Sequence, residues 1–321
     1  MAGRRGAGEG APVLVAAAVS GIAGYAVLVV VARALSTAEN SAFLSFWGAF
    51  FAMCGALGGI TSETTRAVFA GGTTGTTGTT GLGPRVVPVA GGFALVLVAL
   101  VAVTAPLWSG AVFGASRGPL AGAYLLGALL FPIHSGLGGA LSGRAQWSSY
   151  ATLVGSEATM RLLLVAIVAL ATPSEVGFAV ATTAATGTWI LLSLVMPRLR
   201  AGWAARADVA TPAYVARILA ACSAGAATAI LVVGFPVLVR LTSSDAVYAN
   251  AAPIILAVSL TRAPLLVPLG AYQNVAVTKV MAGGPRAIRG VAALVVASTP
   301  VAAVAAYLLG PAVLRLIQPS Y

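Results

Sequence analysis

Charged residues are scarce in this sequence, where they make up 8% of 321 residues against 59% hydrophobic ones. A soluble domain carries roughly 25% charged residues. A soluble fold cannot bury this much apolar surface, so the soluble classes are excluded. Apolar runs of about 20 residues recur, and each is long enough to cross a ~30 Å hydrocarbon core as a helix. The sequence therefore predicts an all-α polytopic membrane protein, because the short alternating segments of a transmembrane β-barrel are absent.

Cysteine, histidine and acidic residues are also few. The sequence has two cysteines, Cys54 and Cys222, one histidine, His134, and seven aspartates and glutamates. Two isolated cysteines inside apolar runs imply neither a disulfide framework nor a metal site. The scattered acids and short loops also argue against a membrane enzyme such as a lipid-linked glycosyltransferase. We expect no catalytic residue, no metal and no cofactor.

Basic residues outnumber acidic ones, and the formal net charge is +11. The basic residues lie singly between apolar runs, which argues against a nucleic-acid partner. The positive-inside rule explains them better. With the N-terminus in the cytoplasm, eleven of the 18 lysines and arginines fall in inner segments, four in outer segments and three within helices. This asymmetry predicts a cytoplasmic N-terminus in a plasma membrane, and the alanine, glycine, valine and arginine bias suggests a bacterial source.

We expect about nine transmembrane helices, each centred on an apolar run. They cover Pro12–Ala32, Ser41–Ile60, Val86–Trp108, Leu120–Gly139, Tyr150–Ala171, Val176–Met196, Ala213–Val239, Ala246–Tyr272 and Ala287–Leu309. The first run is longer than the roughly 7–15-residue core of a signal peptide, so we expect it to remain as a membrane helix.

Two polar segments interrupt the apolar runs. Gly71–Gly83 contains GTTGTTGTTG, which lacks the GK[ST] ending of a phosphate-binding loop and predicts a flexible linker. Pro197–Pro212, PRLRAGWAARADVATP, is the longest charged interruption. We expect it to join two bundles across the cytoplasmic face. The predicted domains are a six-helix N-terminal lobe over 1–196, a linker over 197–212 and a partial C-terminal lobe over 213–321.

The two halves show a weak internal repeat. Leu35–Glu39 and Leu241–Asp245 are similar polar turns, 206 residues apart. An arginine precedes each turn and an aromatic residue follows it. The match suggests a second bundle that repeats the first, which is common among secondary transporters. The alternative is that polar turns between membrane helices simply look alike.

The first of these turns resembles part of a known family. Arg33–Phe43 (RALSTAENSAF), followed by an apolar helix, Gly58-Gly59 and Arg66, resembles the opening of the polysaccharide flippases of the O-antigen and teichoic-acid type. These flippases belong to the multidrug/oligosaccharidyl-lipid/polysaccharide exporter superfamily. Their usual pattern is leucine-serine-proline-x-acid-x-glycine-x-phenylalanine. Here Thr37 stands in place of the proline and Ser41 in place of the glycine.

Two later stretches are similar to the same family. Gly143-Arg144, followed by Glu157 and Arg161, resembles its fourth-to-fifth helix region, and Ser259–Gln273 (SLTRAPLLVPLGAYQ) resembles the eighth helix of actinobacterial members. The resemblance implies twelve helices in two six-helix lobes joined by a cytoplasmic linker. About three helices are then missing after Tyr321, so we expect either a truncated chain or a short member.

Ionisable residues at membrane depth are costly and are functional candidates by default. Glu157 and Arg161 are four residues apart on one helix face. At ~1.5 Å per residue, Arg161 lies ~16 Å from the cytoplasmic end of its helix, near the midplane. Arg262 lies at a similar depth in a helix with several prolines. If the lobes face each other, these groups would line a cavity whose arginines suit a pyrophosphate. Alternatively, Glu157 and Arg161 only neutralise each other, and Arg262 caps carbonyls.

Four more residues are weaker candidates. Arg217 lies one turn into its helix and either contributes to the substrate site or snorkels to the inner interface. Glu63 and Arg66, at the inner end of the second helix, form either a gate or a solvated end. His134 is either a proton relay or a core histidine bonded to a neighbouring helix.

The sequence predicts a flippase or exporter of a lipid-linked oligosaccharide or polysaccharide precursor, working by alternating access. Its expected partners are a polyprenyl-(pyro)phosphate-linked glycan, membrane lipid and envelope glycan biosynthesis proteins. One alternative is a cation-coupled multidrug exporter of the same superfamily, which predicts a cavity dominated by carboxylates. The other is a non-transporting membrane scaffold.

Overall fold

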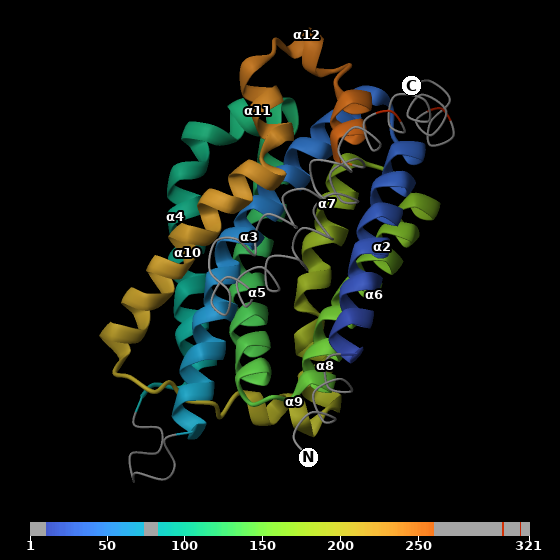
Figure 1. The fold of residues 1–321 in the computed structure, drawn as a ribbon. Helices are drawn as coiled ribbons and strands as arrows, with labels where there is room; N and C mark the ends of the chain where they lie inside the picture. The colour runs from blue at the N-terminus through green and yellow to red at the C-terminus, as the bar shows by residue number, and fades with distance from the viewer. Residues whose placement is uncertain (1–10, 74–82, 260–303, 305–314, 316–321) are drawn as a thin grey trace. The chain divides into compact units, whose positions relative to one another are not determined.

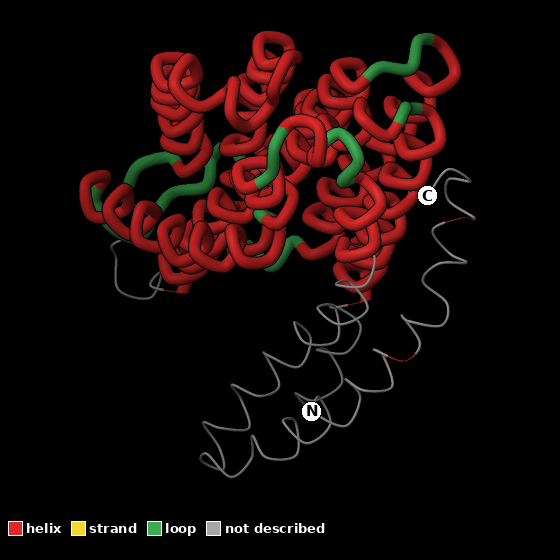
Figure 2. The backbone as a smooth tube through the Cα atoms, turned by 90° about the horizontal axis from the view of Figure 1, so that it is seen from above, coloured by secondary structure: helices red, strands yellow, loops and turns green. Residues whose placement is uncertain are grey.

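The computed structural model describes residues 11–73, 83–259, 304 and 315. Regular structure in these residues is helical, and no strand is drawn among them (Figure 2). Their only β-type pairing is a single antiparallel bridge between Arg85 and Arg206. This agrees with the all-α class expected from the apolar runs.

The helices follow one another with short connections. Their bounds are α2 (Ala11–Ala34), α3 (Thr37–Thr73), α4 (Val86–Phe113), η2 (Gly114–Ser116), α5 (Arg117–Gly143), α6 (Trp147–Ala171), α7 (Glu175–Ala184), η3 (Ala185–Gly187), α8 (Thr188–Val195), α9 (Pro197–Gly202), α10 (Thr211–Val233), α11 (Phe235–Thr242) and α12 (Asp245–Tyr248). Figure 1 labels the α-helices.

Six helical segments of the described chain are long and apolar enough to cross a membrane. They are Pro12–Ala34, Thr37–Gly71, Val86–Gly143, Trp147–Ala171, Glu175–Val195 and Thr211–Ile230. The third segment joins α4 and α5 through η2. The membrane class expected from composition is confirmed, whereas the count of nine helices and the cytoplasmic N-terminus stay predictions. The expected helix Ala287–Leu309 lies outside the described residues apart from Val304.

The chain divides into two compact units, Met1–Ala249 and Asn250–Tyr321. All the labelled helices belong to the first unit. The second unit is described mainly over 250–259, which is helical from Ala252. The predicted lobe boundaries around 197–212 stay a prediction.

Several expected helix bounds are wrong. The helix expected over Ser41–Ile60 runs from Thr37 to Thr73. Its polar second half stays helical because side chains there bond to neighbouring backbone: Thr61 Oγ1 donates to the Ser135 carbonyl at 3.1 Å. The expected N-terminal turn is a capping box, in which Ser36 Oγ and the Ser36 backbone N–H both donate to Glu39 Oε2 at 2.6 and 3.0 Å.

Other expected helices are interrupted. Val176–Met196 is split into α7 and α8 by the 3₁₀ turn η3. Ala213–Val239 is broken at Gly234, between α10 and α11, where Pro236 sits in the first turn of α11. Because proline lacks a backbone N–H, it favours the start of a new helix over continuation of the old one.

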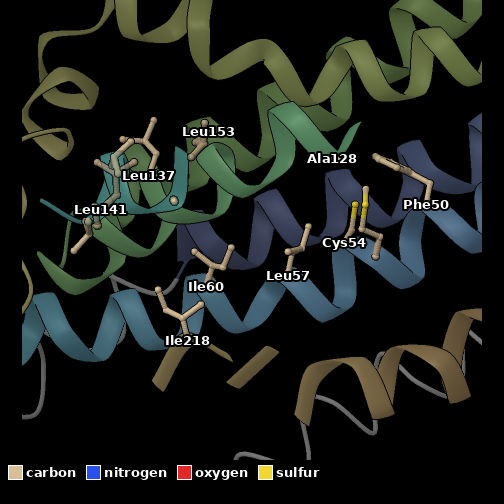
Figure 3. Packing of buried hydrophobic residues seen from close by; sticks show 14 of the residues in the cluster. Phe50, Cys54, Leu57, Ile60, Ala128, Leu137, Leu141, Leu153 and Ile218 are labelled. Atoms are coloured by element: carbon tan, nitrogen blue, oxygen red, sulfur yellow. The ribbon is translucent and has the colours of Figure 1, made fainter. Parts of the chain in front are cut away.

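Helix α3 is the centre of the first unit. It packs against α5 and α10, while α4 packs on α5 and α2 packs on α6. Apolar residues of these helices form one buried cluster, part of which is seen in Figure 3: Phe50, Cys54, Leu57 and Ile60 from α3 face Ala128 and Leu137 from α5 and Leu153 from α6.

Small residues allow α10 to approach α3 closely. A Cβ atom at Gly59 would collide with the backbone of Ala221 and Cys222, and one at Gly55 would lie 2.6 Å from Ala229 Cβ. The Gly55/Gly59 spacing is therefore a packing motif, as membrane helices often use. The similar Gly118/Gly122 spacing is not: a Cβ at either position meets no atom of the described residues within 4 Å.

Candidate functional site

A buried ion pair lies midway along α6. Glu157 and Arg161 are each 7% exposed, and Arg161 Nη2 donates to Glu157 Oε1. Arg161 follows the first residue of α6, Trp147, by fourteen positions. At ~1.5 Å per residue it lies ~21 Å along a helix of about 37 Å. The pair is thus near the middle of a membrane-spanning segment, where charge is most costly.

Residues of α3 and α5 complete this centre. The Arg161 guanidinium carbon lies 4.9 Å from the centroid of the Phe51 ring, a cation–π contact. Both charges of the pair also act electrostatically on Cys54 of α3 and on His134 of α5. We call these five residues, Phe51, Cys54, His134, Glu157 and Arg161, the midplane cluster.

The midplane cluster has unused hydrogen-bonding capacity. Arg161 Nε and His134 Nδ1 are buried and have no hydrogen-bond partner among the described residues. The His134 ring stacks on Phe131, with centroids 5.7 Å apart. A buried polar atom without a partner costs free energy, roughly 1–3 kcal/mol. The unused hydrogen-bonding groups of the cluster are thus one N–H donor on Arg161 and one ring nitrogen on His134.

A second charged cluster ties the end of α3 to the segment after α9. Arg66 Nε and Nη2 donate to Glu63 at 2.9 and 2.6 Å. Arg66 Nη1 and Nη2 donate to the two Asp208 carboxylate oxygens, each at 3.0 Å. Such a bidentate fork fixes geometry better than a single contact. We call Glu63, Arg66 and Asp208 the linker clamp.

Backbone contacts hold the same linker in place. The Val86 N–H donates to the Ala205 carbonyl and the Ala207 N–H to the Pro84 carbonyl, both at 3.0 Å. Arg206 Nη1 donates to the Gly83 carbonyl at 3.0 Å. The linker expected from the sequence is therefore packed against the start of α4. In the described part of the chain, Arg66 donates to both Glu63 and Asp208, and its side chain is 41% exposed.

Comparison with known proteins identifies relatives of this chain. No family model and no solved structure matches the chain. The uncharacterized protein Rv3630 of Mycobacterium tuberculosis is 36% identical over 314 residues, which cover 96% of this chain and 72% of that protein. The chain belongs to the Rv3630 family. The uncharacterized protein Rv1510 of the same organism is 36% identical over 254 residues, covering 78% of this chain and 57% of Rv1510.

Both relatives are proteins of a mycobacterium, which agrees with the bacterial source expected from the composition. Because the match to Rv3630 covers 96% of this chain, it takes in both the midplane cluster and the linker clamp.

Among the described residues, one candidate of this Rv3630-family chain, Arg217, does not join the midplane cluster. Arg217 Nη1 lies 3.9 Å from Asp208 Oδ2, and the Arg217 side chain is 46% exposed. It sits beside the linker clamp, in keeping with the snorkelling alternative. Arg262 lies outside the described residues. Of the four predicted substrate-binding residues, the structure brings together Glu157 and Arg161.

Sequence analysis missed Asp208 as a partner of Arg66, because 142 residues separate them. It also missed a charged cavity of about 840 Å³ where α3, α5, α7 and α12 begin, lined by Arg117, Glu175 and Arg240 among others. These residues are scattered along the chain, and no spacing in the sequence indicates that they meet.

The linker clamp makes stability depend on pH. Hydrogen bonds from Arg66 lower the pKa of Asp208 below its ordinary value. Asp208 therefore contributes stability above about pH 4, its unfolded range, and the contribution is lost as the pH falls through the lowered folded value. We expect Asp208→Asn to lower the melting temperature at pH 7, with a difference from wild type that shrinks toward pH 3. If the difference in melting temperature between Asp208→Asn and wild type stayed constant from pH 7 to pH 3, the Arg66–Asp208 contact would not be the source of the stability.

Proposed function

We propose that this protein is a membrane transporter, a flippase or exporter that moves a lipid-linked oligosaccharide or polysaccharide precursor across the plasma membrane by alternating access. The observation that carries the proposal is Arg161. It is a buried cation in mid-membrane with one N–H group that has no partner among the described residues.

The geometry of Arg161 suits an anionic headgroup. Glu157 accepts a hydrogen bond from Nη2 of the guanidinium, and the Phe51 ring lies 4.9 Å from the central carbon of that group. The Nε donor remains for a phosphate oxygen, and guanidinium groups bind phosphate in a directional way. Glu157 neutralises the cation while the site is empty, which lowers the cost of keeping it in the bilayer. An arriving pyrophosphate would compete with Glu157 for the guanidinium.

The linker clamp supports the alternating-access part of the proposal. Its charges join one end of α3 to the linker that we expect to face the cytoplasm. Opening on that side would break the Arg66–Asp208 contact and closing would restore it. The cytoplasmic N-terminus, the count of about nine helices and the two lobes belong to this proposal.

Transport in proteoliposomes tests the proposal. A fluorescent lipid-pyrophosphate-linked sugar is supplied on one side, and its appearance on the other is followed for wild type, Arg161→Ala and Arg262→Ala. Arg198→Ala is the control, because Arg198 is exposed on α9. We expect transport by wild type and the control, and at least a tenfold loss in Arg161→Ala, as if roughly 1.4 kcal/mol of headgroup binding were removed. A wild type that moves no substrate would overturn the proposal.

A second candidate is the cation-coupled multidrug exporter. His134 favours it: the residue is buried, its Nδ1 has no partner among the described residues, and an imidazole can take up and release a proton. Efflux of a cationic dye driven by a pH gradient and abolished in His134→Gln would support this candidate. Absence of both activities would leave a membrane scaffold.

A further inference from the structure

A cavity of about 840 Å³ lies at the end of the first unit where α4 finishes and α5, α7 and α12 begin. This volume lies within the range of small-molecule sites, roughly 300–1,000 Å³. Its lining combines charges of both signs with small and aromatic residues. The charged residues are Glu39, Arg117, Glu175, Arg240 and Asp245.

Arg240 is held in position inside this cavity. Its Nη1 donates to Asp245 Oδ1 at 2.6 Å, and its guanidinium carbon lies 5.0 Å from the centroid of the Tyr248 ring. The side chain is 12% exposed. It also lies against Gly114, where a Cβ would come within 3.2 Å of Arg240 Nη2 and where φ is 62°. Glycine suits both the positive φ and the close approach.

The Tyr248 ring that contacts Arg240 is itself held in place. Its hydroxyl donates to the Ser41 carbonyl at 2.5 Å, which ties α12 to the first turns of α3. Burial raises the pKa of Tyr248 to about 12, so the hydroxyl keeps its proton at neutral pH. The guanidinium is therefore pre-organised before any ligand arrives, which reduces the entropy lost on binding.

The other charged residues supply acceptors and one free cation. Glu175 begins α7 and accepts a hydrogen bond from Ser116 Oγ, and Glu39 is held by Ser36. Each carboxylate retains further lone pairs for a ligand. Arg117 is exposed; its side chain lies against Gly110, and within the described chain it forms no ion pair.

The charges narrow the class of ligand. Three carboxylates in one lining would repel a polyanion, and two guanidinium groups would repel a cation. The carboxylates do not gather into a metal site, since the described residues hold no group of three acids, histidines or cysteines close enough to bind an ion. Mixed donors and acceptors around an open cavity suit an uncharged ligand rich in hydroxyl groups, because each hydroxyl both donates and accepts.

We propose that this cavity binds a saccharide. The inference deepens the proposed function, on which it rests for the ligand's source: the sugars would be the glycan part of the transported precursor. The midplane cluster would take the charged headgroup, and this cavity would take the glycan at one end of the transport path.

Equilibrium binding to the full chain in nanodiscs tests the inference without any transport step. The probes are free maltotriose, free chitotriose and inorganic pyrophosphate, each titrated by calorimetry. We expect at least one trisaccharide to bind. Arg117→Ala and Glu175→Gln should each weaken that binding about tenfold, the effect of losing one charged hydrogen bond. Arg198→Ala, far along the chain on α9, should bind as wild type does.

Arg117→Ala is the decisive variant, because the Arg117 side chain is exposed and forms no ion pair within the described chain. Failure of both trisaccharides to bind, binding of pyrophosphate alone, or equal saccharide binding in wild type and both cavity variants would each overturn the inference. Saccharide binding that depends on the cavity, in a protein that transports nothing, would uphold the site and reject the proposed function. Transport by a protein that binds no saccharide in this cavity would uphold the proposed function and reject the saccharide site.

Discussion

Replacing Glu157 alone by leucine is expected to destabilise the protein by about 3–5 kcal/mol, because Arg161 would be left buried without its counter-ion. Both side chains are 9% exposed, and Arg161 has no other ion pair among the described residues. The cation–π contact with Phe51 offsets only part of the loss, since such contacts contribute roughly 0.5–2 kcal/mol.

The double variant Glu157→Leu with Arg161→Met should recover most of this stability. Replacing a buried ion pair by apolar residues of similar size is often neutral or stabilising. Chemical denaturation of the two single variants and the double variant gives the coupling between the residues. If the double variant instead lost as much free energy of unfolding as the two single variants together, the buried pair would be contradicted.

Replacing Gly59 by leucine is expected to separate α3 from α10. A Cβ at Gly59 already collides with the backbone at Ala221 and Cys222, so no change of rotamer relieves the contact. Overpacking typically costs about 1–3 kcal/mol, and a clash with backbone falls at the upper end of that range or above it. The melting temperature should fall, and cross-linking between cysteines placed on α3 and α10 should weaken.

Gly58→Leu is the matched control for Gly59→Leu. Gly58 is the preceding residue of the same helix, and a Cβ there meets no atom of the described chain within 4 Å. It adds the same side chain at the same depth. We expect the free energy of unfolding of the control to lie within about 0.5 kcal/mol of that of wild type. Equal losses for the two variants would show that the leucine itself, and not the α3–α10 contact, causes the change.

Much of the helical plan could be predicted because apolar run length determines it. The helix expected over Tyr150–Ala171 is found over Trp147–Ala171. The end of α3 could not be predicted, since the apolar run on which the expected helix was centred stops at Ile60. Thr61 and Arg66 are helical there because neighbours satisfy their side chains, and those neighbours are distant in sequence.

The candidate sites were predicted in the same uneven way. Glu157 and Arg161 were found because helix geometry alone places residues four apart on one face. The position of Arg217 in its helix did not indicate that it lies near Asp208. The glycine spacing is the same in Gly55/Gly59 and Gly118/Gly122, so it did not show which pair packs closely against another helix. The Arg240–Asp245 pair belongs to a turn that looked like a repeat of Leu35–Glu39. Glu39 instead caps its own helix, so similar turn sequences serve different contacts.

Transport by the Glu157→Leu/Arg161→Met double variant tests the central claim most directly, because it separates function from folding. The variant and wild type are reconstituted at equal density and supplied with the lipid-pyrophosphate-linked sugar. If the midplane cluster binds the headgroup, the double variant melts like wild type but transports at least about tenfold more slowly. A stable double variant that transports at the wild-type rate would show that the ion pair is only structural, and the claim would fail.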